Sequence, residues 1–147
     1  MKFLRHILFL LFVVMLMPST MVAQNVFYGY PSDDVKLGEE DKIIVSIPDH
    51  WDGKFNNTKD LEELLNYICS SDLTLKIKVI VFRGAKDFSI AYSEALCSDL
   101  KKRLFDRCSN KDGCQIVPIG KAEPLYHDKS NIGKYYKHNT RIEIIIE

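Results

Sequence analysis

The chain has 147 residues, which is enough for one domain. Its 20 basic and 20 acidic side chains give a formal net charge of zero. This balance excludes the strongly basic surface with which proteins bind nucleic acid or an anionic membrane surface, so we expect neither partner.

The first 23 residues have the order of a secretory signal peptide. Lys2 and Arg5 precede an apolar run from Ile7 to Met17, and small residues lead to Ala23. The run is shorter than the ~20 residues that cross a bilayer as a helix. We therefore expect residues 1–23 to be removed after export, which leaves a mature chain with a small negative charge and no transmembrane segment.

Residues 24–40 contain aromatic side chains, one proline and an acidic cluster, with no sustained period. We interpret them as an extended N-terminal arm. The arm either covers an exposed edge of the core or presents Phe27, Tyr28 and Tyr30 to a partner.

Two predicted elements open the domain, which we expect to span residues 41–147. Segment 41–47 is rich in β-branched residues and is bounded by Pro48, which predicts a strand. Asp52-Gly53 marks a turn in the loop that follows. Residues 58–70 then carry apolar side chains at helical spacing, which predicts an amphipathic helix. Its apolar positions are Leu61, Leu64, Leu65 and Ile68.

The stretch from Leu73 to Phe105 predicts a buried strand that leads into a helix through a short polar turn. Its first ten residues alternate apolar and polar and then become continuously apolar. After Asp87, apolar side chains recur every four residues along one stripe. The stripe consists of Phe88, Tyr92, Leu96, Leu100 and Leu104. The turn at residues 83–87 is the first candidate ligand site, because strand ends and helix N-termini expose backbone N–H groups.

The last third of the chain predicts two more strands. Segment 115–119 is short, and its Pro118 favours a sheet edge. A long polar and aromatic loop at 120–139 leads to segment 140–147, whose alternate isoleucines 142, 144 and 146 point inward. The order strand, helix, strand, helix, strand, loop, strand predicts an α/β (α+β) two-layer sandwich. In it, two helices lie on one face of a mixed sheet.

All four cysteines lie in the exported part, where disulfides are more common than free thiols. Cys108 and Cys114 bracket the turn-forming sequence SNKDG, so we expect them to pair. Cys69 with Cys97 then follows by elimination, among three connectivities that four cysteines allow. A zinc site is the alternative, but no CxxC pair or nearby histidine supports it, and we expect no metal and no cofactor.

Four groups of residues carry a family resemblance. They are VIVFRGAKDFSIAYSEALCSDLKKRL, then GKAEP at 120–124, NIGK at 131–134 and NTRIEI at 139–144. Together they resemble the OmpA-like family, the C-terminal, peptidoglycan-associating domain of outer-membrane protein A. The resemblance covers about residues 41–147. It implies a cell-envelope location and association with peptidoglycan.

The resemblance also implies a ligand site with altered charges. In the family, an aspartate and a helix arginine hold the charged ends of a diaminopimelate residue in the peptidoglycan stem peptide. By spacing, these two positions fall on Ala85 and Leu100, which cannot supply the charge-assisted hydrogen bonds. Asp87 is placed to replace the aspartate, although it also fits the N-cap of the helix, and Leu100 fits the core. The candidate ligand-binding residues of the altered groove are Arg83, Asp87, Tyr92, Asn139 and Arg141.

Two interpretations of function follow. The first is an exported envelope protein of a Gram-negative bacterium, in the periplasm or at the periplasmic face of the outer membrane, that binds the peptidoglycan stem peptide non-covalently. The alternative is a degenerate OmpA-like fold that serves as a protein-interaction or structural module, with an envelope protein as its partner. We do not expect an enzyme, because the histidines and Cys97 fall into no spacing that a nucleophile, base or metal site needs.

Overall fold

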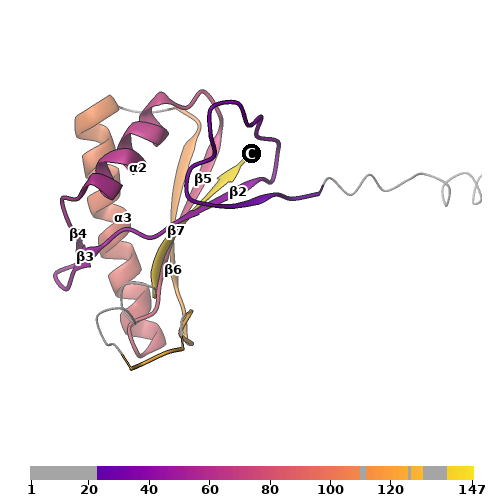
Figure 1. Ribbon diagram of the computed structural model, residues 1–147. Helices are drawn as coiled ribbons and strands as arrows, with labels where there is room; N and C mark the ends of the chain where they lie inside the picture. The colour runs from indigo at the N-terminus through magenta and orange to yellow at the C-terminus, as the bar shows by residue number, and fades with distance from the viewer. Residues whose placement is uncertain (1–22, 110–111, 126, 131–138) are drawn as a thin grey trace, which may run out of the picture.

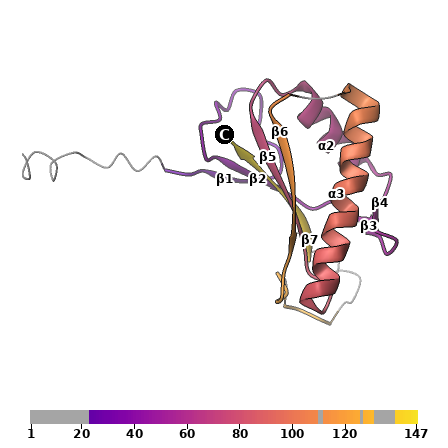
Figure 2. The same cartoon turned by 180° about the vertical axis from the view of Figure 1, so that it is seen from behind.

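The computed structural model describes residues 23–109, 112–125, 127–130 and 139–147. They form two layers, a five-stranded sheet and two helices on one of its faces (Figure 1), and the view from behind shows the same arrangement (Figure 2). The predicted two-layer sandwich is thereby confirmed. The elements are β1 (Val26–Tyr28), β2 (Lys42–Val45), β3 (Asp49–His50), β4 (Lys54–Phe55), α2 (Lys59–Ser70), β5 (Leu75–Val81), α3 (Lys86–Cys108), β6 (Cys114–Gly120) and β7 (Thr140–Ile146).

The C-terminal strand β7 lies at the centre of the sheet, whose strand order is β1-β2-β7-β5-β6. It runs antiparallel to both of its neighbours, whereas β5 is parallel to β6 and β1 is parallel to β2. Ile142 and Ile144 of β7 are fully buried in the core, as their alternation predicted. The sheet is therefore mixed, and its middle strand comes from the end of the chain.

The helix α2 begins where the sequence predicted. Thr58 is its N-cap, and the Thr58 hydroxyl accepts a hydrogen bond from the backbone N–H of Leu61 at 3.3 Å. All four apolar residues of the predicted face are buried. The predicted signal peptide, by contrast, lies outside the described residues except for Ala23. Within the described ranges, no helix has the length and apolar character needed to cross a membrane.

The helix α3 begins two residues earlier than a cap at Asp87 requires. Its N-cap is Ala85, which has extended backbone angles and makes no side-chain capping bond. The interpretation of Asp87 as the N-cap is therefore wrong. Asp87 lies inside the first turn, where its exposed carboxylate is still favoured by the positive end of the helix dipole.

The apolar stripe of α3 starts at Tyr92 rather than at Phe88, which is 51% exposed. An α-helix has 3.6 residues per turn, so a strict four-residue spacing gradually rotates away from the core. Ser89, three residues before Tyr92, occupies the buried position instead. The rest of the stripe, including Leu100, is buried as predicted.

A disulfide joins the C-terminal ends of the two helices. Cys69 in the last turn of α2 bonds to Cys108, the last residue of α3, and their Cα atoms are 5.8 Å apart. The expected pairs Cys108–Cys114 and Cys69–Cys97 are therefore wrong. Cys97 is buried in the core from the middle of α3, and Cys114 is the first residue of β6.

The N-terminal arm contributes β1, which pairs with the outer side of β2 and covers that edge of the sheet. The Asp41 carboxylate fastens it. One oxygen accepts hydrogen bonds from the backbone N–H and side-chain amide of Asn25 at 2.9 and 3.0 Å, and the other accepts from the Gly38 N–H at 2.8 Å. Farther along, the Tyr30 ring packs against Tyr67 of α2, with centroids 5.1 Å apart. The arm is thus held by both layers.

The strand β6 forms the opposite edge of the sheet, and it contains Pro118, as predicted. Its last residue, Gly120, lies directly against α3. A Cβ atom at Gly120 would be 2.3 Å from the backbone nitrogen of Ile90 and 2.6 Å from its Cα. Because these atoms belong to the helix backbone, they cannot move aside as a flexible side chain would.

We expect Gly120→Ala to lower the free energy of unfolding by about 1–3 kcal/mol, the usual cost of overpacking. Urea denaturation measures the loss. Gly38→Ala is the matched control, because its Cβ would lie 3.8 Å from the Asp41 carboxylate, an ordinary contact. Equal stability of the two variants would contradict the close approach of α3.

The hydrogen bonds that the Asp41 carboxylate accepts from Asn25 and Gly38, called the Asp41 clamp below, should break in acid. Hydrogen bonds from Gly38 and Asn25 lower the pKa of Asp41 below its ordinary 3.8. The clamp therefore stabilises the fold above pH 3.8, and this contribution disappears as the pH falls through the lowered folded pKa. We expect the Lys42 amide, which donates to the Asn25 carbonyl at 2.8 Å, to lose protection from hydrogen exchange over that range. Asp41→Ala should show the weaker protection already at neutral pH, and an unchanged profile in this variant would refute the clamp.

Candidate functional site

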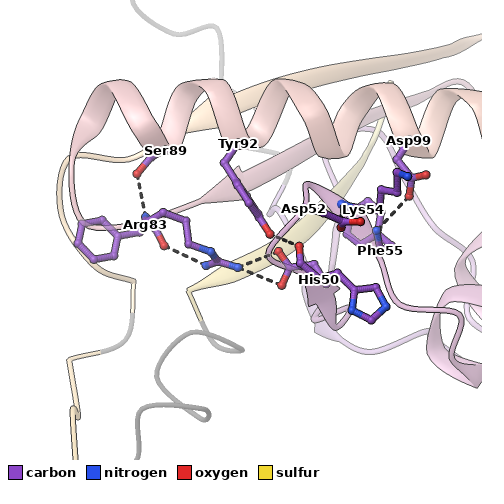
Figure 3. A network of polar contacts seen from close by, with 10 residues as sticks. His50, Asp52, Lys54, Phe55, Arg83, Ser89, Tyr92 and Asp99 are labelled. Atoms are coloured by element: carbon purple, nitrogen blue, oxygen red, sulfur yellow. Dashed lines mark hydrogen bonds and ion pairs between the residues drawn. The ribbon is translucent and has the colours of Figure 1, made fainter.

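Arg83 lies two residues after the end of β5, and its side chain is buried. Its guanidinium donates to both oxygens of the Asp49 carboxylate at 3.0 and 2.7 Å, and also to the Phe82 carbonyl at 3.0 Å (Figure 3). The two paired side chains are only 2% and 8% exposed. Arg83 is therefore buried, and its charge is neutralised by Asp49.

Two aromatic rings enclose the Arg83 guanidinium. The central carbon of the guanidinium lies 4.9 Å from the Tyr92 ring centroid and 5.4 Å from that of Trp51. These are cation–π distances, which gain strength when the cation is removed from water. The Tyr92 hydroxyl donates to the His50 carbonyl. Burial raises the pKa of Tyr92, so this hydroxyl remains protonated and able to donate at neutral pH.

The segment expected to be a loop after the first strand folds into a small hairpin, β3–β4, with its turn at the predicted Asp52-Gly53. Gly53 has a φ of +80°, and a Cβ there would lie 2.7 Å from the Ala95 side chain of α3. A carboxylate of α3, Asp99, accepts from the Phe55 N–H at 3.0 Å. Figure 3 shows how the hairpin is held at both ends, at Arg83 and at Asp99.

Four of the five predicted site residues lie at the end of the sheet where β5 passes into α3. Arg83 and Tyr92 are in contact. Asn139 is fully buried, and its carbonyl accepts from the Phe82 N–H at 2.8 Å. Asp87 lies exposed in the first turn of α3. In the part of the chain that the structure describes, the Asp87 carboxylate has no hydrogen bond or ion pair.

The fifth residue, Arg141, lies on the other face of the sheet. Its neighbour Ile142 points into the core, so Arg141 points away from the helices, because side chains alternate along a strand. Its guanidinium pairs with Glu143 at 2.7 Å, and Glu143 also pairs with Lys42 at 3.3 Å. The structure therefore does not bring Arg141 together with Arg83 or Asp87.

Asp49 and Trp51 also belong to this site, although no pattern in the sequence predicted them there. Asp49 is 34 positions before Arg83, so no local spacing connects them. A usable signal was present, because an arginine that directly follows a buried strand requires an acidic partner. The predicted motif at 131–134 lies outside the described residues.

His50, His127 and Asp128 are exposed, and no group of three or more metal-ligating side chains is found in the ranges that the structure covers; His138 is outside them. Burial raises the pKa of the Cys97 thiol to about 11, which keeps it protonated and a poor nucleophile.

The fold resembles a known structure. The crystal structure of the peptidoglycan-associated lipoprotein from Burkholderia pseudomallei superimposes with a TM-score of 0.53 and 17% sequence identity, over 69% of this chain and 88% of that one. At this identity the likeness shows a shared fold alone. No family model and no curated protein sequence matches the chain.

The buried pair generates a stability prediction. We expect Asp49→Ala or Arg83→Met to lower the free energy of unfolding by about 3–5 kcal/mol, because each leaves a buried charge without its partner. Removing both should cost less than the sum, and a double-mutant cycle in urea measures the coupling. Lys59→Ala is the control, since the exposed Lys59–Glu63 pair is worth at most about 1 kcal/mol. Additive losses would contradict the pairing.

Proposed function

We propose that this chain is an exported cell-envelope protein whose domain associates non-covalently with peptidoglycan. The observation that carries the proposal is the fold shared with a protein that is named for its association with peptidoglycan. The order of charged, apolar and small residues in positions 1–23 supports export. Together they favour the periplasm or the periplasmic face of the outer membrane.

In this proposal the stem peptide is bound at the start of α3. A diaminopimelate residue has both an ammonium and a carboxylate, so it needs groups of both signs. Asp87 is an exposed carboxylate and fits the ammonium. The usual arginine has no counterpart, because Arg83 is paired with Asp49 and Arg141 with Glu143. The first turn of α3, which lacks a side-chain cap, offers backbone N–H groups and a positive dipole end to the carboxylate instead.

The other predicted residues support this position. Tyr92 and Arg83 fix the hairpin against α3, and the Ser89 hydroxyl accepts from the Arg83 N–H at 2.8 Å and donates to the Ala85 carbonyl at 2.8 Å. Asn139 joins the start of β7 to the end of β5. These contacts hold the turn before α3 in one conformation, which lowers the entropy cost of binding.

The alternative function is a protein-interaction or structural module that does not bind peptidoglycan. This alternative is favoured by Arg83, because its charge is already neutralised by Asp49. It is also favoured by Tyr28 on the edge strand β1, whose side chain is 86% exposed and fits a partner protein better than solvent.

Co-sedimentation with purified sacculi tests the proposal. The protein, purified after export of the full chain, should sediment with sacculi. Asp87→Ala should weaken this about tenfold or more, since a hydrogen bond to a charged group is worth about 1.5–3 kcal/mol. Asp106→Ala is the matched control, because Asp106 is an equally exposed carboxylate at the far end of the same helix.

Circular dichroism should show that both variants are folded. Wild-type protein that stays in the supernatant would leave the interaction module as the better function. Equal sedimentation of Asp87→Ala and wild type would show that the stem peptide does not bind at Asp87.

A further inference from the structure

Trp51 lies in the turn of the β3–β4 hairpin, and 64% of its surface is exposed. A tryptophan offers a large apolar area, and leaving it in water forgoes the stabilisation that its burial would give. Phe88, in the first turn of α3, is also more than half exposed. Its ring lies 6.0 Å from that of Tyr92, which in turn contacts Arg83. Trp51, Tyr92 and Phe88 are called the aromatic platform below.

The backbone on both sides of Trp51 is fixed, although the residue lies in a turn. Before it, Asp49 is held by Arg83 and the His50 carbonyl by Tyr92. After it, Gly53 packs on Ala95. The Trp51 ring itself lies over the Arg83 guanidinium, which orients it. An exposed aromatic ring that is oriented before binding loses little conformational entropy when a ligand stacks on it.

The chemistry of the platform selects the ligand class. Arg83 and Asp49 neutralise each other, so neither of these two charges is available to an ionic peptide group. A stable protein interface needs about 800 Å² from each partner, whereas an aromatic side chain supplies about 150–250 Å². Because Tyr92 is only 6% exposed, the open surface of the platform comes from Trp51 and Phe88. This surface is much smaller than a protein interface and suits a ligand of the size of a sugar ring.

A sugar ring suits the surroundings as well. Its C–H face is apolar and stacks on aromatic rings, while its hydroxyl and acetamido groups need hydrogen-bonding partners nearby. The exposed side chains of His50 and Asp52 flank Trp51 in the hairpin. Figure 3 shows the His50 imidazole pointing away from the Arg83–Asp49 pair, so it is not used in holding the hairpin.

We propose that the aromatic platform binds a sugar ring of the peptidoglycan glycan strand, with Trp51 as the stacking residue. This inference rests on the proposed function, and it adds a second subsite beside the stem-peptide position at Asp87. The glycan and the peptide of the same polymer would then be bound by neighbouring but chemically different surfaces, one aromatic and the other formed by the exposed Asp87 carboxylate.

Trp51 is the single tryptophan of the chain, so intrinsic fluorescence reports on the platform directly. The probes are glycan strands freed of stem peptides by an amidase, and a soluble diaminopimelate-containing stem peptide. We expect the glycan strands to shift the Trp51 emission in a saturable way and the stem peptide to leave it unchanged.

Variants identify the stacking residue. Trp51→Ala should bind glycan strands about tenfold more weakly in co-sedimentation, whereas Trp51→Phe should keep most of the affinity. Phe105→Ala is the matched control, because Phe105 is an exposed aromatic residue at the far end of α3 and should bind as wild type does. Thermal unfolding verifies that each variant is folded.

The outcomes separate the two proposals. If glycan strands leave the emission unchanged, and Trp51→Ala sediments with intact sacculi as well as wild type does, the platform is overturned while peptidoglycan association stands. If wild type binds neither intact sacculi nor glycan strands, both fail. An emission shift with the stem peptide alone would also overturn the assignment of the platform to sugar.

Discussion

The ion pair between Arg83 and Asp49 connects the β3–β4 hairpin to the segment that follows β5. The hairpin β3–β4 has strands of two residues each, which are too short to be stable alone. The pair fixes this hairpin to the end of β5 and, through Tyr92, to α3. Replacing such a pair with apolar residues is often neutral, whereas removing one partner is costly. Because Arg83 is buried, the stability of the folded protein depends on its partner Asp49.

The same pair constrains function. A buried guanidinium that is saturated by a carboxylate cannot also bind the carboxylate of a ligand. The end of the sheet is thereby divided into two surfaces of different character. One is the start of α3 with the exposed Asp87, and the other is the aromatic surface around Trp51. The proposed ligand, a sugar strand that carries peptide branches, offers one kind of group to each surface.

Local patterns in the sequence predicted most of the fold. The spacing of Leu61, Leu64 and Ile68 defined α2, and the alternating isoleucines defined β7, because each pattern reports burial within a single element. Asp87 and Phe88 were misassigned because both depend on the phase of the helix start, which a two-residue shift changes. The sandwich itself followed from the order of the elements.

Contacts between distant segments could not be predicted in the same way. Cys69 and Cys108 are 39 residues apart and meet only because α2 and α3 end side by side. In the site, the sequence identified Arg83 and Tyr92 but not the partners that decide their role. Asp49 and Trp51 belong to a segment whose position follows from the packing of the hairpin on α3, and no periodicity reports such packing.

The Cys69–Cys108 disulfide makes the stability of this chain depend on the redox state of its surroundings. A bond that closes a loop of 39 residues stabilises the folded state by about 4 kcal/mol in the chain-entropy model. That is a large part of the 5–15 kcal/mol that typically separates folded from unfolded domains. If the chain is exported as proposed, it would lack this stabilisation in the reducing cytoplasm and would be easier to unfold and translocate there. After oxidation, the disulfide would stabilise the folded form of the same chain.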